Sequence, residues 1–178
     1  MLGQQEICDR DLSVTPADTT VFGAGAGDYL ADRFSLASGD FNDDGFADAL
    51  VGAPLADGPG AARENAGEAY IIFGTANPPA TIDLALGTAV TVIGENPGDN
   101  LGFTVASGDV NGDGRDDAIV GARFASTATA PGAGKAYVFY GREDLSGVFD
   151  TAAGGQDVTV TGHPGDFLTI ALTTGDVN

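Results

Sequence analysis

The sequence predicts an all-β fold assembled from blades of four antiparallel strands, the architecture of a β-propeller. Three observations lead to this prediction. The chain repeats itself, each copy contains four short runs with strand-like patterns, and no stretch shows helical periodicity over three turns. We expect the chain to be a fragment of a larger ring, because known rings need roughly 4–8 blades to close.

The repeat is plainest in two pairs of segments. "FSLASGDFNDDGFADALVGA" at 34–53 aligns without a gap with "FTVASGDVNGDGRDDAIVGA" at 103–122, so that residue 34 lies opposite residue 103, an offset of 69. Next, "GEAYIIFG" at 67–74 aligns with "GKAYVFYG" at 134–141, an offset of 67. Self-similarity at a fixed period is typical of repeat architectures, in which each copy is one supersecondary unit.

Further segments extend the repeat in both directions. "VTVIGENPGD" at 90–99 matches "VTVTGHPGD" at 158–166 with one residue deleted. A third copy restarts at 169–176, and "VFGAGAGD" at 21–28 parallels the glycine-rich run that ends at Asp99. We therefore expect two nearly complete blades, flanked by parts of two others.

The four strands of one copy can be justified in chain order. Phe34 and Leu36 alternate with smaller residues, which is the period of a half-buried strand. "DALVGA" is a short apolar run, "AYIIF" is rich in aromatic and β-branched residues, and "VTVI" alternates strictly. Gly, Pro, Asn and Asp separate these runs, as turns between strands require. The second copy repeats the same order of patterns.

The positions of the repeated segments predict the domain organisation. Residues 19–178 form a propeller fragment, with blade repeats at about 32–99 and 101–166 and the start of a third at 167–178. Residues 1–18 match no part of the repeat, and their role stays undefined. The sequence stops inside a motif whose earlier copies continue, so we expect the remaining blades in the same polypeptide. Assembly of several chains into one ring is the alternative.

A loop motif after the first strand of each copy predicts a cation site. In "DFNDDGFAD" the side chains at positions 1, 3, 5 and 9 carry oxygen, position 6 is a glycine that permits positive φ, and position 7 offers its backbone carbonyl. Closely spaced hard oxygen ligands favour calcium over magnesium, and zinc lacks its His and Cys ligands here. The candidate ligands are Asp40, Asn42, Asp44, Phe46 and Asp48 in the first copy, and Asp109, Asn111, Asp113, Arg115 and Asp117 in the second.

Two other interpretations apply to loops of this composition. An EF-hand would need a bidentate Glu at position 12, where these loops have Val51 and Val120, and its flanks would be helical. A turn rich in Asp, Asn and Gly also folds without any ion, although the same ligand set in two loops favours a metal. If calcium binds, we expect it to stiffen the loop and neutralise carboxylates rather than to catalyse a reaction.

Composition excludes several function classes. The formal net charge of −19 leaves no basic patch for nucleic acid or for an anionic membrane surface. No run approaches the roughly 18 apolar residues of a membrane span, and the N-terminus has no signal-peptide pattern. Cys8 is the one cysteine, His163 lies in a glycine-rich turn, and no nucleophile–base constellation can be assembled, so this chain is not expected to be an enzyme.

At "LGFTVASGDVNGDGRDDAIVGA" (101–122) and "GDFNDDGFADALVGAP" (39–54) the chain resembles the FG-GAP repeat, which builds the seven-bladed propeller of integrin alpha chains. Related repeats occur in a glycosylphosphatidylinositol-specific phospholipase D and in bacterial surface proteins. The resemblance implies calcium at the ligand positions given above and an incomplete third site that begins at Asp176 and Asn178. The name-giving dipeptides have diverged, which points to a relative of bacterial type.

The resemblance implies a calcium-stabilised interaction or adhesion module, extracellular or at the cell surface, that binds protein or glycan through propeller loops. The alternative is an accessory propeller in a larger secreted hydrolase or lyase whose catalytic residues lie outside this chain. The connections 55–66 and 124–133 differ between the copies and are the candidates for partner contact. Loops with few charges and no Glu clamp should bind calcium at about 10⁻⁴–10⁻³ M, the range of extracellular modules.

Overall fold

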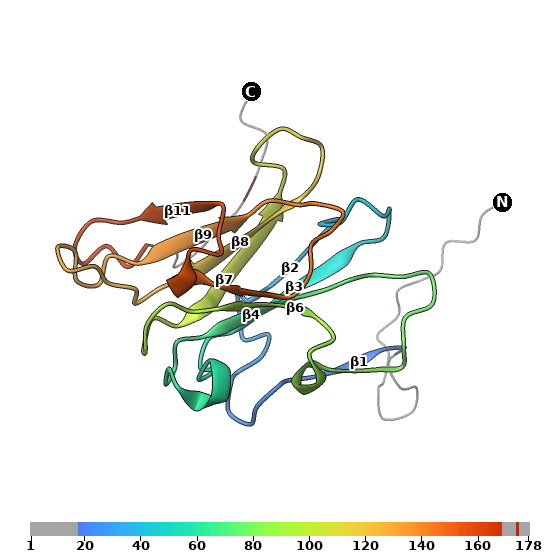
Figure 1. The fold of residues 1–178 in the computed structure, drawn as a ribbon, viewed down its shortest axis with the longest axis horizontal. Helices are drawn as coiled ribbons and strands as arrows, with labels where there is room; N and C mark the ends of the chain where they lie inside the picture. The colour runs from blue at the N-terminus through green and yellow to red at the C-terminus, as the bar shows by residue number, and fades with distance from the viewer. Residues whose placement is uncertain (1–17, 169–173, 175–178) are drawn as a thin grey trace.

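The structure, a computed structural model, describes residues 18–168 and Thr174. In these residues it consists of strands and turns, with three 3₁₀ helices of one turn each, so the all-β prediction is confirmed (Figure 1). The strands are β1 (Thr20–Phe22), β2 (Leu36–Gly39), β3 (Asp48–Ala53), β4 (Glu68–Ile72), β5 (Thr81–Asp83), β6 (Val90–Ile93), β7 (Leu101–Gly108), β8 (Asp117–Ala122), β9 (Lys135–Phe139), β10 (Val148–Asp150) and β11 (Val158–Thr161). The 3₁₀ helices are η1 (Pro59–Ala61), η2 (Leu84–Leu86) and η3 (Thr151–Ala153).

The two repeats form two sheets that lie one over the other (Figure 1). The first has the strand order β10-β6-β4-β3-β2 and the second the order β11-β9-β8-β7. Within each sheet the four strands of a repeat are antiparallel neighbours, as the strand patterns predict. Strand β7 of the second sheet packs against β2 and β3 of the first. Each repeat therefore folds as a four-stranded sheet that is covered on one face by the next.

A short parallel strand joins each repeat to the one before it, which the strand patterns do not predict. Strand β10 of the second repeat pairs in parallel with β6 of the first, with Asp150 opposite Ile93. Strand β5 of the first repeat pairs in the same way with β1, with Asp83 opposite Phe22. The parallel pairing of β1 with β5 is therefore equivalent to the parallel pairing of β6 with β10, one repeat further along the chain. Strand β1 therefore takes the place that the last strand of an earlier copy would have, and the assignment of an earlier copy stays a prediction.

The main core lies between the two sheets, which meet through opposite faces, so the two repeats contribute different positions to it. Tyr137 belongs to this core, whereas its counterpart Tyr70 packs in a second cluster with Ala53, Ala56 and Leu84. Both tyrosines are almost fully buried. The main cluster consists of Phe41, Leu50, Ala69, Ile71, Val90, Val92, Leu101, Val105, Ala118, Val120, Ala122, Ala125, Tyr137, Phe139 and Leu145. These are mostly the inward-facing residues of β3, β4, β6, β7, β8 and β9, so the period-2 pattern identifies the core face.

The two sheets approach each other so closely that glycine is required at the contact. A Cβ atom on Gly52 of β3 would lie 2.0 Å from the carbonyl oxygen of Gly102, which is backbone and cannot move aside. The sheets are also fastened along their first strands, because the Ser107 hydroxyl donates to the carbonyl of Ser38 at 2.6 Å. Thr174, one repeat further on, donates in the same way to the carbonyl of Ser107. The same side-chain contact to a backbone carbonyl therefore recurs at an interval of one repeat.

Candidate metal-binding loops

Both candidate loops lie at the same end of the sheets, which we call the metal-loop end. The first joins β2 to β3 and the second joins β7 to β8, so each follows the first strand of its repeat. Gly45 and Gly114, at loop position 6, have φ of 84° and 92°. A residue with a Cβ atom rarely adopts this conformation, so these glycines allow the chain to turn back over the preceding carboxylate.

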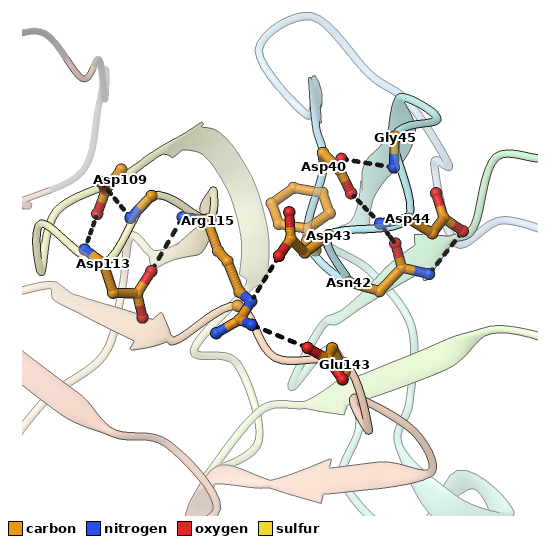
Figure 2. Close-up of polar contacts among 12 residues, drawn as sticks. Asp40, Asn42, Asp43, Asp44, Gly45, Asp109, Asp113, Arg115 and Glu143 are labelled. Atoms are coloured by element: carbon orange, nitrogen blue, oxygen red, sulfur yellow. Dashed lines mark hydrogen bonds and ion pairs between the residues drawn. The ribbon is translucent and has the colours of Figure 1, made fainter.

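In the first loop the side chains at positions 1, 3 and 5 gather around backbone N–H groups (Figure 2). Asp40 accepts from the N–H of Asp44 at 3.1 Å and from that of Gly45 at 2.9 Å. Asn42 Oδ1 shares the Asp44 N–H at 3.3 Å, and the Asp44 carboxylate accepts from Phe46 N at 2.9 Å. This network draws the oxygens of positions 1, 3 and 5 towards one side of a tight turn.

The second loop has the same network. Asp109 accepts from the N–H of Asp113 at 3.1 Å and from that of Gly114 at 2.8 Å, and it also accepts from Gly112 at 2.6 Å. Asn111 Oδ1 accepts from Asp113 N at 2.8 Å. The N–H groups bonded to Asp109 hold its pKa below the usual range, with the bond from Gly114 contributing most. Asp109 is therefore ionised at neutral pH, as a calcium ligand must be.

The aspartates at position 9 have a structural role. Asp48 and Asp117 are 2% and 0% exposed. Asp48 accepts from Phe41 N of its own loop at 2.9 Å and from Gly74 N, beyond β4, at 2.8 Å. Asp117 makes the equivalent pair of bonds, both 2.9 Å long, with Val110 N and Gly141 N. Each buried carboxylate thus ties its loop to the end of a neighbouring strand. Burial raises the pKa of both, although the N–H bonds act in the opposite direction.

The two loops touch through Arg115, which lies at position 7 of the second loop (Figure 2). Its Nε lies 3.5 Å from Oδ2 of Asp43 in the first loop, and its Nη2 lies 3.1 Å from Oε1 of Glu143. Asp43 has a φ of 60°, whereas the second loop has Gly112 at the same place with a φ of 79°. Aspartate tolerates this left-handed conformation better than most residues do, at a modest cost. The ion pair across the repeats offsets that cost.

Hydrogen bonds to the backbone of the first loop reinforce its contact with the second repeat. Asp116 Oδ2 accepts from Asp40 N at 3.0 Å, and Asp116 N donates to the Asp40 carbonyl. Arg142 N, beyond β9, donates to the Phe41 carbonyl at 2.9 Å. The first loop is therefore braced by the second repeat on both sides of its first ligand position. The loop motif does not predict the roles of Asp43, Asp116 and Glu143, because nothing in one loop shows which residues of the next repeat face it.

The donor chemistry of both loops fits calcium. All proposed side-chain ligands are carboxylate or amide oxygens, and a carboxylate oxygen that accepts one N–H keeps a second lone pair for a cation. Among the described residues no three His, Cys, Asp or Glu side chains form a preformed metal cluster. The ligand assignments, including the Phe46 and Arg115 carbonyls and position 9, stay predictions. Asp176 and Asn178 lie outside the described residues.

At the opposite end of the sheets, each repeat has a buried tyrosine hydroxyl bonded to a glutamate, but only the second repeat adds a lysine to this contact. In the second repeat the buried ammonium of Lys135 bonds Glu95, which also accepts from Tyr137 Oη at 3.0 Å. Burial opposes ionisation of Glu95, but these two bonds outweigh it and lower its pKa. In the first repeat Glu68 stands at the position of Lys135 and accepts from Tyr70 Oη. Burial raises the pKa of Glu68, and the negative charges of Asp28 and Asp57 act in the same direction.

The candidate partner loops lie at this opposite end, since each follows the second strand of its repeat. His163 is exposed in the turn after β11, where its Nδ1 lies 3.3 Å from Oδ2 of Asp166. In the described part of the chain, no helix is both long enough and apolar enough to cross a bilayer.

Comparison with known proteins finds one family model that matches the segments containing both loops. Residues 34–72 and 101–139 match the model of the FG-GAP repeat. Phosphatidylinositol-glycan-specific phospholipase D of Rattus norvegicus is 36% identical over 110 residues, which are 61% of this chain and 13% of that protein. The Homo sapiens protein of the same name is 33% identical over 115 residues, 64% of this chain and 14% of that protein. The chain thus spans about one seventh of these relatives, and each matched segment contains one metal-loop motif. The chain therefore carries two segments that match the FG-GAP repeat, one in each of the two described repeats.

Proposed function

We propose that this chain is part of a calcium-stabilised β-propeller that serves as an extracellular or cell-surface interaction module. The observation that carries the proposal is the set of hydrogen bonds that the two loops share, which gathers Asp40, Asn42 and Asp44, and again Asp109, Asn111 and Asp113. Calcium would be held by these oxygens. It would offset part of the formal charge of −19 where the two repeats meet.

The extracellular location follows from the expected affinity. The loops lack the bidentate Glu clamp, so their calcium dissociation constants should be about 10⁻⁴–10⁻³ M, as in extracellular modules. Sites of this affinity are empty at cytosolic calcium concentrations and filled outside the cell. A module that needs calcium for rigidity would therefore reach full stability outside the cell.

Exposed apolar positions support further blades on both sides of the two sheets. Leu36 of β2 is 63% exposed, whereas its counterpart Val105 of β7, which the first sheet covers, is 6% exposed. Val160 of β11 is 49% exposed, whereas its counterpart Val92 of β6 is fully buried. The same positions are buried where a neighbouring repeat exists and exposed where none is described. Further repeats of the same polypeptide would cover them in a closed ring.

An accessory propeller of a larger secreted enzyme is the second candidate. The specific observation in its favour is the similarity to phosphatidylinositol-glycan-specific phospholipase D, of which this chain matches only 13 to 14%. Chemistry would then lie in another domain. Sequencing the gene on both sides of these residues distinguishes the candidates, since a flanking domain with a catalytic motif favours the second and further repeats alone favour the first.

Thermal unfolding with calcium and with a chelator tests the metal-dependent part of the proposal. Calcium should raise the unfolding midpoint of the wild type, and the double substitution Asp40→Ala with Asp109→Ala should abolish this difference. Arg142→Gln, which leaves every proposed ligand intact, is the matched control and should keep the calcium response. Identical melting of the wild type in both buffers would refute calcium stabilisation.

A further inference from the structure

The two metal loops are joined by contacts that come from two adjacent residues of the second loop. Arg115 Nε lies 3.5 Å from Oδ2 of Asp43, at position 4 of the first loop (Figure 2). Asp116 Oδ2 accepts from Asp40 N at 3.0 Å, and Asp116 N donates to the Asp40 carbonyl at 3.3 Å. These contacts hold the first loop at positions 1 and 4, on both sides of its candidate ligand Asn42.

The same two residues of the second loop lie between groups that are proposed to bind calcium. Arg115 is at position 7, where its carbonyl is a candidate ligand, and Asp116 is followed by the candidate ligand Asp117 at position 9. Every residue from Asp109 to Gly114 is exposed, so without an ion this part of the loop is held by hydrogen bonds that water can replace. An ion in the second loop would therefore order the backbone from which the contacts to the first loop are made.

Arg115 contacts the first loop at a residue with an unfavourable backbone conformation. Asp43 has a φ of 60°, a value at which a side chain costs free energy. This conformation turns the chain between two candidate ligands, so that Asn42 Oδ1 accepts from Asp44 N at 3.3 Å and Asn42 Nδ2 donates to Asp44 Oδ2 at 2.9 Å. The ion pair with Arg115 thus stabilises the conformation in which the ligand oxygens of the first loop gather.

The arginine is itself held in place by the second repeat. Its Nη2 lies 3.1 Å from Oε1 of Glu143, and its side chain is 29% exposed, whereas that of Asp43 is 55% exposed. A guanidinium fixed between two carboxylates loses less side-chain entropy when it pairs with either of them. All the residues of this contact belong to the two described repeats, so no further repeat is needed to form it.

Repulsion between two bound cations acts in the opposite direction, but salt weakens it. Each loop has four aspartates, so the metal-loop end stays negatively charged with both ions bound, and the second ion is still attracted. At physiological ionic strength, charges in solvent are screened over about 8 Å. The Asp116 hydrogen bonds and the order of the backbone are not screened in this way. The net effect of one ion on the other should therefore be favourable.

We propose that the two loops bind calcium as a coupled pair, in which an ion in the second loop raises the affinity of the first through the Arg115–Asp43 and Asp116–Asp40 contacts. By linkage, an ion in the first loop raises the affinity of the second by the same factor. The side chains of Arg115 and Asp43 position ligands and bind no ion themselves. This inference rests on the proposed calcium function and adds its regulation, because coupled sites fill over a narrower range of calcium concentration than independent sites do.

Calorimetric titration of the full chain with calcium, at physiological ionic strength, measures the coupling factor. Asp109→Ala gives the affinity of the first loop alone, Asp40→Ala that of the second, and the wild type gives the product of both affinities and the factor. The wild-type factor should be about 5–20 in favour of joint binding. Asp43→Gly, which removes the ion pair but suits the positive φ, should lower the factor by about 2- to 5-fold. Arg142→Gln is the control and should leave it unchanged.

Variants of Arg115 separate positioning from a general loss of stability. Arg115→Gln should lower the coupling factor as Asp43→Gly does, the two together should lower it no further, and Arg115→Lys should keep part of it. A factor of one or less in a wild type that binds two ions overturns the coupling and leaves the calcium sites intact, as does a factor that both single variants leave unchanged. Absence of calcium binding overturns the coupling and the calcium proposal together. Asp113→Ala and Asp44→Ala replace Asp109→Ala and Asp40→Ala if either does not fold.

Discussion

Replacement of Asp117 should destabilise the chain whether or not calcium is present. Its carboxylate is fully buried and accepts two backbone N–H bonds, from Val110 and Gly141. Asp117→Ala leaves both N–H groups without a partner, and each unsatisfied buried group costs about 1–3 kcal/mol. The two together predict a loss of about 2–5 kcal/mol, because removing a desolvated charge returns part of the cost. That is a large fraction of the 5–15 kcal/mol typical of a domain.

Urea unfolding in a chelator is the assay, with Asp109→Ala as the matched variant. Asp109 is exposed, and the loop N–H groups that it leaves can bond to water, so its replacement should change stability little without calcium. Asp117→Asn should lie between Asp117→Ala and the wild type, since it keeps one acceptor but turns an amide N–H₂ towards an N–H. The reasoning is refuted if Asp117→Ala unfolds like the wild type in the chelator, or if its loss appears only when calcium is added.

Three further predictions test contacts between the repeats. Arg115→Gln should lower the free energy of unfolding by about 0.5–1 kcal/mol, and a double-mutant cycle with Asp43→Asn should show coupling that 1 M salt reduces; purely additive losses would contradict the ion pair. Burial raises the pKa of Glu68 above 4.5, so the folded state binds its proton more tightly than the unfolded state and stability falls as pH rises through the folded value. Glu68→Gln should therefore be more stable than the wild type at pH 7 and lose this advantage below about pH 4.5, as a pH series of urea melts would show; an advantage that grows towards low pH would refute it. Gly52→Ala should prevent stable packing of the sheets, because its Cβ would lie 2.0 Å from the Gly102 carbonyl oxygen, and a soluble variant with a wild-type melting midpoint would contradict this close approach.

The sequence predicts the strands well because their patterns are local. The alternation around Phe34 and Leu36, the apolar "DALVGA" run and the aromatic "AYIIF" run all become neighbouring antiparallel strands. Strands β5 and β10 were missed because three residues show no period. The repeat could have revealed them, since "TIDLALG" at 81–87 and "VFDTAAG" at 148–154 share an aspartate that caps the following 3₁₀ turn.

The candidate site was predictable in part for the same reason. Ligand spacing within one loop is local, so the motif gives the side chains at positions 1, 3 and 5 that the hydrogen bonds gather around Asp40 and Asp109. The contact of Arg115 with Asp43 and Glu143 depends on how one sheet lies on the next, and no short segment encodes it. Position 9 was assigned as a ligand from spacing alone. The structure adds that Asp48 and Asp117 are buried anchors, which spacing cannot distinguish from an exposed ligand.

The most direct test of the central claim is calorimetric titration of the chain with calcium at low ionic strength. The account predicts binding to the two described loops, with dissociation constants of about 10⁻⁴–10⁻³ M. Asp40→Ala and Asp109→Ala should each remove one binding event, and the double variant should remove both. Absence of calcium binding by the folded wild type, or binding that survives in the double variant, would contradict the assignment of these loops as calcium sites.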